Sequence, residues 1–586
     1  MENNISALYQ IFGNSKKAHM KKAIVLVGLA LSLSILTTKP MAQGTSVKEK
    51  ELPKGWHLLD KETDGVYGIS LQKAYDLVKG KKSQTIVVAV IDSGIDTLHE
   101  DLKEILWVNP KEIPGNGIDD DGNGYIDDVH GWNFLGGKDG RNVKEDSYEG
   151  ARVYHQLKPR FDGKMIDTAT LSADEKSDYA TWLKVKERIE GDATGGGADL
   201  IIMRRALDAS VKNDSILRVA MNKQVYTGAD LDSFSATTPE ASKAKAGFLY
   251  LFKANNMMET KNNDFLNDFK EYVVSQERKK EALDKAPENY RAEIVKDNEA
   301  DINDRYYGNS DIMAGTPMHG THVSGIIGAQ RNNNKGMDGV ADNVRIMMIR
   351  AVPDGDEHDK DIALAIRYAV DNGARVVNMS FGKSFSPQKQ WVDDAVKYAE
   401  SKGVLLVHAA GNDANNVDST DNFPNPVFKG THTHTTNWIT VGASSDPKAE
   451  SFKSYTASFS NYGKQEVDVF APGTRIYATL PGGTTYGNLQ GTSMASPVVA
   501  GVAALILSYY PNLTPQQLKA VIVKSAVKPT TKVKVPGTEE LVELSDISQS
   551  GGILNAYGAM KLAAALKGDA KPAPLPKSSL KKGTKG

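Results

Sequence analysis

The chain has 586 residues, of which 40% are hydrophobic and 25% charged. This is the composition of an ordinary globular protein, and it excludes collagen-like and disordered chains. The 71 Lys and Arg residues nearly balance the 73 Asp and Glu residues, so we expect no nucleic-acid partner. The chain contains no cysteine, which excludes disulfides, thiolate catalysis and cysteine zinc sites. The length predicts about four domains, unless long insertions extend one of them.

The first 42 residues have the layout of a secretory signal peptide. Four lysines, the last at Lys22, precede an apolar run from Ala23 to Leu36, and a cleavage site near Ala42 follows. The run is shorter than the roughly 20 residues that span a bilayer, so a permanent membrane anchor is the weaker alternative. We expect an exported protein, periplasmic or extracellular, in which residues 1–42 are the signal peptide and residues 43–80 an N-terminal extension.

Short apolar runs alternate with helical patterns along most of the remaining chain. Five runs are rich in branched side chains and end in polar residues, which predicts buried strands. These runs are 86–91, 346–352, 376–379, 404–407 and 439–441. Apolar residues spaced three and four apart predict helices at 362–370 and 515–523. The alternation predicts an α/β fold with a mostly parallel sheet flanked by helices.

Residues 140–309 differ from the rest of the chain. Charged residues dominate there, and helix-start signals such as the Ser172 and Glu175 capping box recur. We interpret this stretch as a large, mostly helical insertion without chemistry of its own, with Gly195–Gly197 as a flexible joint. The insertion divides the α/β domain into a first part, residues 81–139, and a second part, residues 310–565. The lysine- and proline-rich residues 566–586 are expected to form a disordered basic tail.

Three short segments carry side chains suited to nucleophilic catalysis. Ser493 lies in Gly-Thr-Ser-Met-Ala-Ser-Pro at the start of an apolar helix, where negative charge would be stabilised. His319 opens His-Gly-Thr-His, and Asp92 ends the first apolar run in Asp-Ser-Gly. Alone, each segment is also compatible with a different role: a helix cap, a histidine metal pair or an aspartic-protease motif. The sequence holds no His-Glu-x-x-His and no second Asp-Ser-Gly or Asp-Thr-Gly, which weakens the last two.

The order Asp, His, Ser across these segments resembles the subtilisin-like serine peptidases. The resemblance covers about residues 80–130 and 310–560, and it implies Asp92, His319 and Ser493 as the catalytic triad. In such a triad the imidazole removes the serine proton, and the carboxylate orients the imidazole and stabilises its charged form. We therefore expect an exported serine endopeptidase that hydrolyses peptide bonds in proteins or peptides through an acyl-enzyme on Ser493.

The resemblance assigns further residues to the same chemistry. Asn412, in Ala-Ala-Gly-Asn after another apolar run, is implied as the side-chain donor to the oxyanion. The segment that follows the run 376–379 is implied as a substrate-binding edge, where an extended peptide would pair through its backbone. The residues implied for substrate binding are Ser380, Phe381, Gly382 and Gly411.

The loop from Asp119 to Asp128 has the oxygen spacing of a calcium-binding loop. Its candidate ligands, at positions one, three, five, seven and nine, are Asp119, Asp121, Asn123, the Tyr125 carbonyl and Asp127. Position twelve is His130 instead of glutamate, so Asp128 would have to substitute, and a solvated turn is the alternative. Separately, Asp101 and the loop 332–334 resemble the structural calcium site of the family.

Two alternatives to the peptidase stay open. The first is a catalytically inactive, calcium-stabilised binding or scaffold protein of the same fold. The second, an α/β-hydrolase esterase, is disfavoured because the segment around Ser493 lacks the Gly-x-Ser-x-Gly elbow. The peptidase chemistry requires no cofactor, calcium would serve only structure, and the sequence does not indicate an oligomeric state. Since the insertion lies between Asp92 and His319, we expect it to restrict the access of large substrates.

Overall fold

The structure is a computed structural model that describes residues 52–254, 257–258, 260–281, 284–315, 317–448, 453–566 and 568. The predicted signal peptide and all but two residues of the predicted tail lie outside this range. The described chain forms two compact units. One comprises residues 150–287, within the predicted insertion, and is called the helical unit here. The other comprises the described residues on either side and is called the sheet unit.

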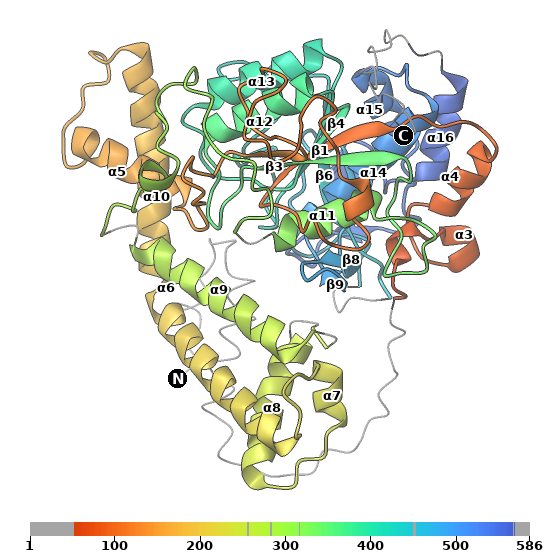
Figure 1. Cartoon of the computed structure of the whole chain (residues 1–586). Helices are drawn as coiled ribbons and strands as arrows, with labels where there is room; N and C mark the ends of the chain where they lie inside the picture. Colours follow the sequence, from red (N-terminus) through yellow and green to blue (C-terminus); the bar gives the residue numbers. More distant parts are fainter. Residues whose placement is uncertain are drawn as a thin grey trace. The chain divides into compact units, whose positions relative to one another are not determined.

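The sheet unit is built on one seven-stranded sheet in the order β2-β3-β1-β4-β5-β6-β7 (Figure 1). Every pairing between these strands is parallel, which confirms the predicted α/β class. The five predicted runs fall on β1, β3, β4, β5 and β6. The bounds are β1 Ile86–Asp92, β2 Gly131–Asn133, β3 Val344–Arg350, β4 Val376–Met379, β5 Leu405–Ala409, β6 Trp438–Ser444 and β7 Val469–Pro472.

Helices cover both faces of this sheet, and β1 shows why its strands are apolar throughout. Successive side chains of a strand point to opposite faces. Ile86, Val88 and Val90 therefore pack with α11 and α14, whereas Ala89 and Ile91 pack with α12 and α13 (Figure 1). A strand buried on both faces must be apolar at every position. The helices are α11 Met318–Gly328, α12 Asp359–Asp371, α13 Lys389–Ser401 and α14 Thr492–Tyr509.

Among the described residues, α14 is the one helix long and apolar enough to cross a membrane, and 89% of it is buried inside the sheet unit. Smaller elements complete the unit, including the antiparallel pairs β8–β9 and β10–β11. Their bounds are η1 Trp56–Leu58, α3 Lys61–Asp64, α4 Leu71–Val78, η2 Lys103–Ile105, α10 Tyr290–Ile294, β8 Ile476–Leu480, β9 Thr485–Leu489, α15 Pro515–Lys524, β10 Val533–Lys534, β11 Leu541–Val542, η3 Leu544–Asp546 and α16 Ala556–Ala565.

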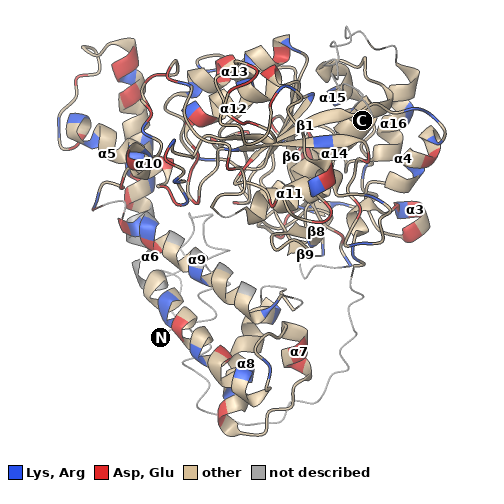
Figure 2. Ribbon diagram, in the orientation of Figure 1, with Lys and Arg blue, Asp and Glu red and all other residues tan. Residues whose placement is uncertain are grey.

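The helical unit is helical, as the sequence predicts. Its elements are α5 Glu149–Phe161, which begins one residue before the unit, α6 Ala173–Ala220, α7 Gly228–Ser233, α8 Pro239–Ala254 and α9 Asn262–Glu281. The Ser172 and Glu175 capping box starts α6. The flexible joint predicted at Gly195–Gly197 is wrong, because α6 is continuous through it. Each glycine costs about 1 kcal/mol in a helix, and the packing of α6 against α8 and α9 opposes that cost. Acidic and basic residues are interspersed along α6 and α8 (Figure 2).

Candidate active site

Several of the predicted site residues lie at the carboxyl edge of the sheet, where α/β proteins build their sites. Asp92 is the last residue of β1. Because Ile91 pairs with Met379 on β4, Asp92 and Ser380 lie at adjacent positions of this edge. Asn412 follows shortly after the end of β5, which is the next strand in the sheet.

Asp92 and His319 form a hydrogen-bonded pair in which the carboxylate is buried and the imidazole is partly exposed. His319 Nδ1 lies 2.8 Å from Asp92 Oδ1, which also accepts the Ser93 N–H at 2.8 Å. Burial alone would lower the pKa of His319, but the charge of Asp92 and its hydrogen bond outweigh burial, so the pKa is raised above its ordinary value. In the neutral imidazole this bond keeps the proton on Nδ1 and leaves Nε2 as the acceptor.

Gly320 lets the first turn of α11 approach Asp92. A Cβ at this position would lie 2.2 Å from the Gly94 carbonyl oxygen and 3.1 Å from Asp92 Oδ1. The first distance is shorter than real contacts allow and the second is tight, so a side chain at this position would push α11 away from β1. The glycine of the His-Gly-Thr-His segment thereby allows His319 to reach Asp92.

Ser493 lies in the first turn of α14 and exchanges hydrogen bonds with Ser380. Its hydroxyl donates to the Ser380 carbonyl at 3.1 Å, and the Ser380 hydroxyl donates to the Ser493 carbonyl at 3.0 Å. In a regular helix the Ser493 carbonyl would accept the N–H of residue 497, but Pro497 has no N–H. Pro497 therefore leaves this carbonyl to Ser380, and the pair fixes Ser493 against the residue that follows β4.

Asn412 is oriented by the residue before Ser493. Its Oδ1 accepts from the Thr492 N–H at 2.8 Å and from the Thr492 hydroxyl at 3.0 Å, which leaves Nδ2 for another partner. Gly491 has a φ of 148°, and a Cβ there would lie 3.4 Å from Asn412 Nδ2 and 3.6 Å from the Ser493 nitrogen. The two nitrogens thus border one small space beside Gly491. Two nitrogens at one place are the starting point for an oxyanion hole, which requires N–H donors aimed at the developing charge.

The predicted substrate-binding edge has one carbonyl turned into the protein. His408 Nε2 lies 2.8 Å from the Phe381 carbonyl oxygen. Burial lowers the pKa of His408 to about 4, against the opposing effect of this bond, so the neutral ring donates to the carbonyl. The neighbouring Ser380 carbonyl has a different partner, because it accepts the Ser493 hydroxyl. Gly411 donates its N–H to the Thr492 hydroxyl at 3.1 Å.

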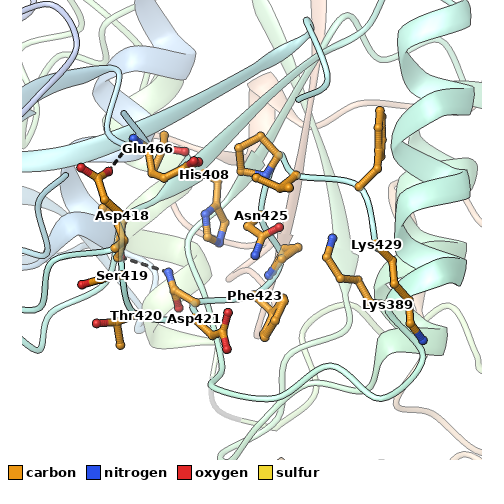
Figure 3. A pocket seen from close by; sticks show the side chains of 18 of the residues that line it. Lys389, His408, Asp418, Ser419, Thr420, Asp421, Phe423, Asn425, Lys429 and Glu466 are labelled. Atoms are coloured by element: carbon orange, nitrogen blue, oxygen red, sulfur yellow. Dashed lines mark hydrogen bonds between the residues drawn. The ribbon is translucent and has the colours of Figure 1, made fainter. Parts of the chain in front are cut away.

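A cavity of about 440 Å³ lies next to this edge (Figure 3). His408, Ala410 and Asn422 contribute to its lining, and most of the other lining residues belong to the loop 417–431. Asn422 Nδ2 donates to the Ala410 carbonyl at 3.0 Å, and a Cβ on Gly382 would lie 2.8 Å from Asn422 Oδ1. Asn422 therefore fills the space between the two chain segments that border the site. No sequence motif marks this residue.

The predicted calcium ligands have different surroundings in the structure. Asp119 and Asp121 are close to each other, but the third member of their group is Glu112, which the sequence motif misses because this residue precedes the twelve-residue loop. Asn123 Oδ1 accepts the Tyr125 N–H at 2.8 Å.

Two other predicted ligands have different partners. The Asp127 carboxylate accepts the N–H groups of Gly115 and Gly117, both at 2.8 Å, and so closes a turn. Asp101 accepts from the Asn333 side chain at 2.5 Å and from the Tyr486 hydroxyl at 2.8 Å. Asp101 and the loop 332–334 therefore lie side by side, joined by the hydrogen bond from Asn333 to Asp101.

The parallel sheet carries at its carboxyl edge a hydrogen-bonded Asp–His pair, a serine at a helix start and a nearby amide. This combination defines the class of subtilisin-like α/β proteins. A model of the Subtilase family matches residues 83–559. The chain belongs to the Subtilase family. This confirms the resemblance drawn from the three sequence segments.

The relatives include named serine proteinases. The thermophilic serine proteinase of Bacillus sp. (strain AK1) is 38% identical over 243 residues, which cover 41% of this chain and 52% of the relative. Thermitase of Thermoactinomyces vulgaris is 35% identical over 251 residues, 42% of this chain and 80% of thermitase. Subtilisin DY of Bacillus licheniformis is 40% identical over 205 residues, 34% of this chain and 67% of the relative. The chain thus spans about half the length of the thermophilic serine proteinase.

Proposed function

We propose that the chain is an exported serine endopeptidase that hydrolyses peptide bonds in proteins or peptides. The observation that carries the proposal is the 2.8 Å His319–Asp92 hydrogen bond at the same sheet edge as the Ser380–Ser493 pair. Relatives named serine proteinases support the activity, and a relative named an extracellular protease, with the signal-like N-terminal sequence, supports export.

Each residue has a defined step in this reaction. His319 Nε2 takes the proton of Ser493 Oγ as Oγ bonds to the substrate carbonyl carbon, and the carbonyl electron pair moves to its oxygen. Asn412 Nδ2 and the Ser493 N–H donate to that oxyanion, while buried Asp92 stabilises the imidazolium. His319 then gives the proton to the leaving amine as the C–N bond breaks. Water then bonds to the acyl carbon as His319 takes its proton, and His319 returns that proton to Ser493 Oγ as the C–Oγ bond breaks and the acid leaves.

The Ser380 carbonyl links substrate binding to the nucleophile. In the structure it accepts the Ser493 hydroxyl at 3.1 Å. A substrate that pairs along residues 380–382 presents backbone N–H groups to this edge. A substrate N–H on the Ser380 carbonyl would displace the Ser493 hydroxyl, which then becomes available to donate to His319. Recognition through the backbone explains how such a site accepts many peptide sequences.

Labelling by a fluorophosphonate probe, together with hydrolysis of casein and of a small peptide substrate, tests the proposal. We expect the wild-type chain to be labelled and active, and Ser493→Ala to lose both properties. Ser401→Ala is the matched control, because its hydroxyl is exposed at the end of α13, where it donates to the Tyr398 carbonyl. A folded wild-type protein without labelling or hydrolysis would refute the proposal and favour the inactive binding or scaffold protein.

A further inference from the structure

The acidic loop before β2 brings three carboxylates together. Between Asn109 and Asp128 the chain carries six carboxylates and one lysine. One carboxylate oxygen each of Glu112, Asp119 and Asp121 lie within 4.8 Å of one another. Oxygens that bind one calcium ion at 2.3–2.6 Å are separated by about 5 Å or less. The three oxygens therefore have the spacing of ligands around a single ion.

Glu112 supplies an independent observation. The residue is 7% exposed, and its Oε1 accepts the N–H groups of Asp120 at 3.0 Å and Asp121 at 3.2 Å. Its Oε2 is buried and has no hydrogen-bond partner within the part of the chain that the structure describes. A buried polar atom without a partner costs roughly 1–3 kcal/mol, and more when it is charged. A bound cation would remove this cost, which makes Oε2 a candidate metal-ligand atom.

The other two carboxylates are held in place by the loop itself. Asp119 accepts the N–H groups of Asn123 at 3.1 Å and of Gly124 at 2.8 Å, and Asp121 Oδ1 accepts that of Asn123 at 3.0 Å. Lys111 Nζ lies 3.5 Å from Asp121 Oδ2, but its side chain is 66% exposed. One solvated ammonium cannot neutralise three clustered carboxylates, so the group lacks most of its countercharge.

We propose that Glu112, Asp119 and Asp121 bind one calcium ion. Glu112 provides, from before the loop, the glutamate ligand that a calcium-binding loop normally carries at position twelve. His130 holds that position here and lies 2.7 Å from the Trp107 carbonyl oxygen through its Nδ1. An irregular set of carboxylates and loop carbonyls suits calcium, whereas magnesium requires near-ideal octahedral geometry.

The ion would connect the two ends of the loop and stabilise the edge of the sheet. Tyr125, in the same loop, packs with its ring centroid 5.0 Å from that of Trp132 on β2 and 5.1 Å from that of Tyr368 on α12. Fixing Glu112 to Asp119 and Asp121 therefore fixes the segment that enters this aromatic cluster. Calcium should raise the thermal stability of the chain.

Terbium luminescence in the full-length Ser493→Ala chain tests the proposal without self-digestion. Tb³⁺ replaces calcium, and excitation of nearby Tyr125 and Trp132 sensitises its emission. We expect sensitised emission that Ca²⁺ displaces and an equal concentration of Mg²⁺ does not. Glu112→Gln should weaken Tb³⁺ binding at least tenfold and reduce the rise in Tm on adding calcium. Asp120→Asn is the matched control, because its carboxylate accepts from Ile113 and Asn116 instead.

Three outcomes would overturn the proposal. They are a wild-type loop without displaceable emission, a Glu112→Gln chain with unchanged Tb³⁺ affinity, and equal displacement by Mg²⁺, which would remove the assignment to calcium. If Glu112→Gln does not fold, Asp121→Asn decides by equilibrium dialysis against calcium. One calcium fewer per chain than in Asp120→Asn supports the site, and equal numbers refute it.

Discussion

Replacing Asn412 by Asp should separate the oxyanion contact from the contacts that hold the residue in place. Asn412 Oδ1 accepts from the Thr492 N–H and hydroxyl at 2.8 and 3.0 Å, and a carboxylate oxygen accepts both equally well. The substitution removes the Nδ2 donor and adds negative charge where the oxyanion develops. We therefore expect a stably folded protein with strongly reduced turnover.

The expected loss of turnover has two contributions, the missing donor and the added negative charge. Removal of one oxyanion donor lowers kcat by roughly 100- to 1,000-fold, a magnitude known from subtilisin, itself a member of this family. In Asn412→Asp the repulsion between two negative charges about 4 Å apart adds up to roughly 4 kcal/mol at an effective dielectric constant of 20. Water screens part of this, because Asn412 is exposed. We expect kcat to fall more than 1,000-fold with KM little changed, since the contact forms in the transition state.

Asn412→Ala is the comparison that completes the experiment. It removes the donor and also both hydrogen bonds to Thr492, each worth about 1 kcal/mol. Its kcat should fall by about 100- to 1,000-fold, and its free energy of unfolding by about 1–2 kcal/mol. Initial rates on a chromogenic peptide and urea unfolding curves measure the two effects. If Asn412→Asp retained more than a tenth of the wild-type kcat, Asn412 would not be an oxyanion donor.

Further predictions concern pH, stability and substrate size. The base must be neutral and the pKa of His319 is raised above 6.5, so kcat/KM should fall as the pH drops through a value above 6.5. A wild-type pH profile in which kcat/KM falls only below pH 6.5 would contradict the assignment. Asp92→Asn should lower the rate about 10⁴-fold. Asp361 and Arg291 form a buried bidentate pair at 2.5 and 2.7 Å, and Asp297 also contacts Arg291 at 2.8 Å. Asp361→Asn removes one of these two carboxylates and should cost up to about 3–5 kcal/mol in urea unfolding; a loss under about 1 kcal/mol would contradict this. Replacing residues 150–287 by a Gly-Ser linker should raise casein hydrolysis relative to peptide hydrolysis, and an unchanged ratio would argue against restricted access.

Patterns that repeat along the chain could be predicted from the sequence, whereas contacts across loops could not. The strands of the sheet are recognisable because burial on both faces makes them apolar at every position, as in β1. In a parallel sheet the polar residues at the ends of these strands lie at one edge, so the sequence also predicts that Asp92 lies at the carboxyl edge. By contrast, spacing within a loop does not show how the loop folds back. Asp127 has the spacing of a ligand but closes a turn, and Glu112 reaches the group from outside the motif.

Gly195–Gly197 and Pro497 lie inside continuous helices for a similar physical reason. Local propensity predicts a break at both places, but α6 and α14 are long helices that continue through them. Tertiary packing outweighs a local cost of this size. At Pro497 the missing N–H also creates a function that propensity does not describe, because it leaves the Ser493 carbonyl to Ser380.

The parallel register of β1 against β3 pairs Ile86 with Val344. This pairing joins two strands that are separated in the sequence by all the residues of the helical unit. Ribosomes make Asp92 early and Ser493 late, and a nascent chain that has not yet supplied α14 lacks its nucleophile. A fragment that ends before residue 492 would therefore carry Asp92 and His319 without the proposed nucleophile. Closing so long a stretch of chain also slows folding, because the entropy of loop closure opposes the pairing of β1 with β3.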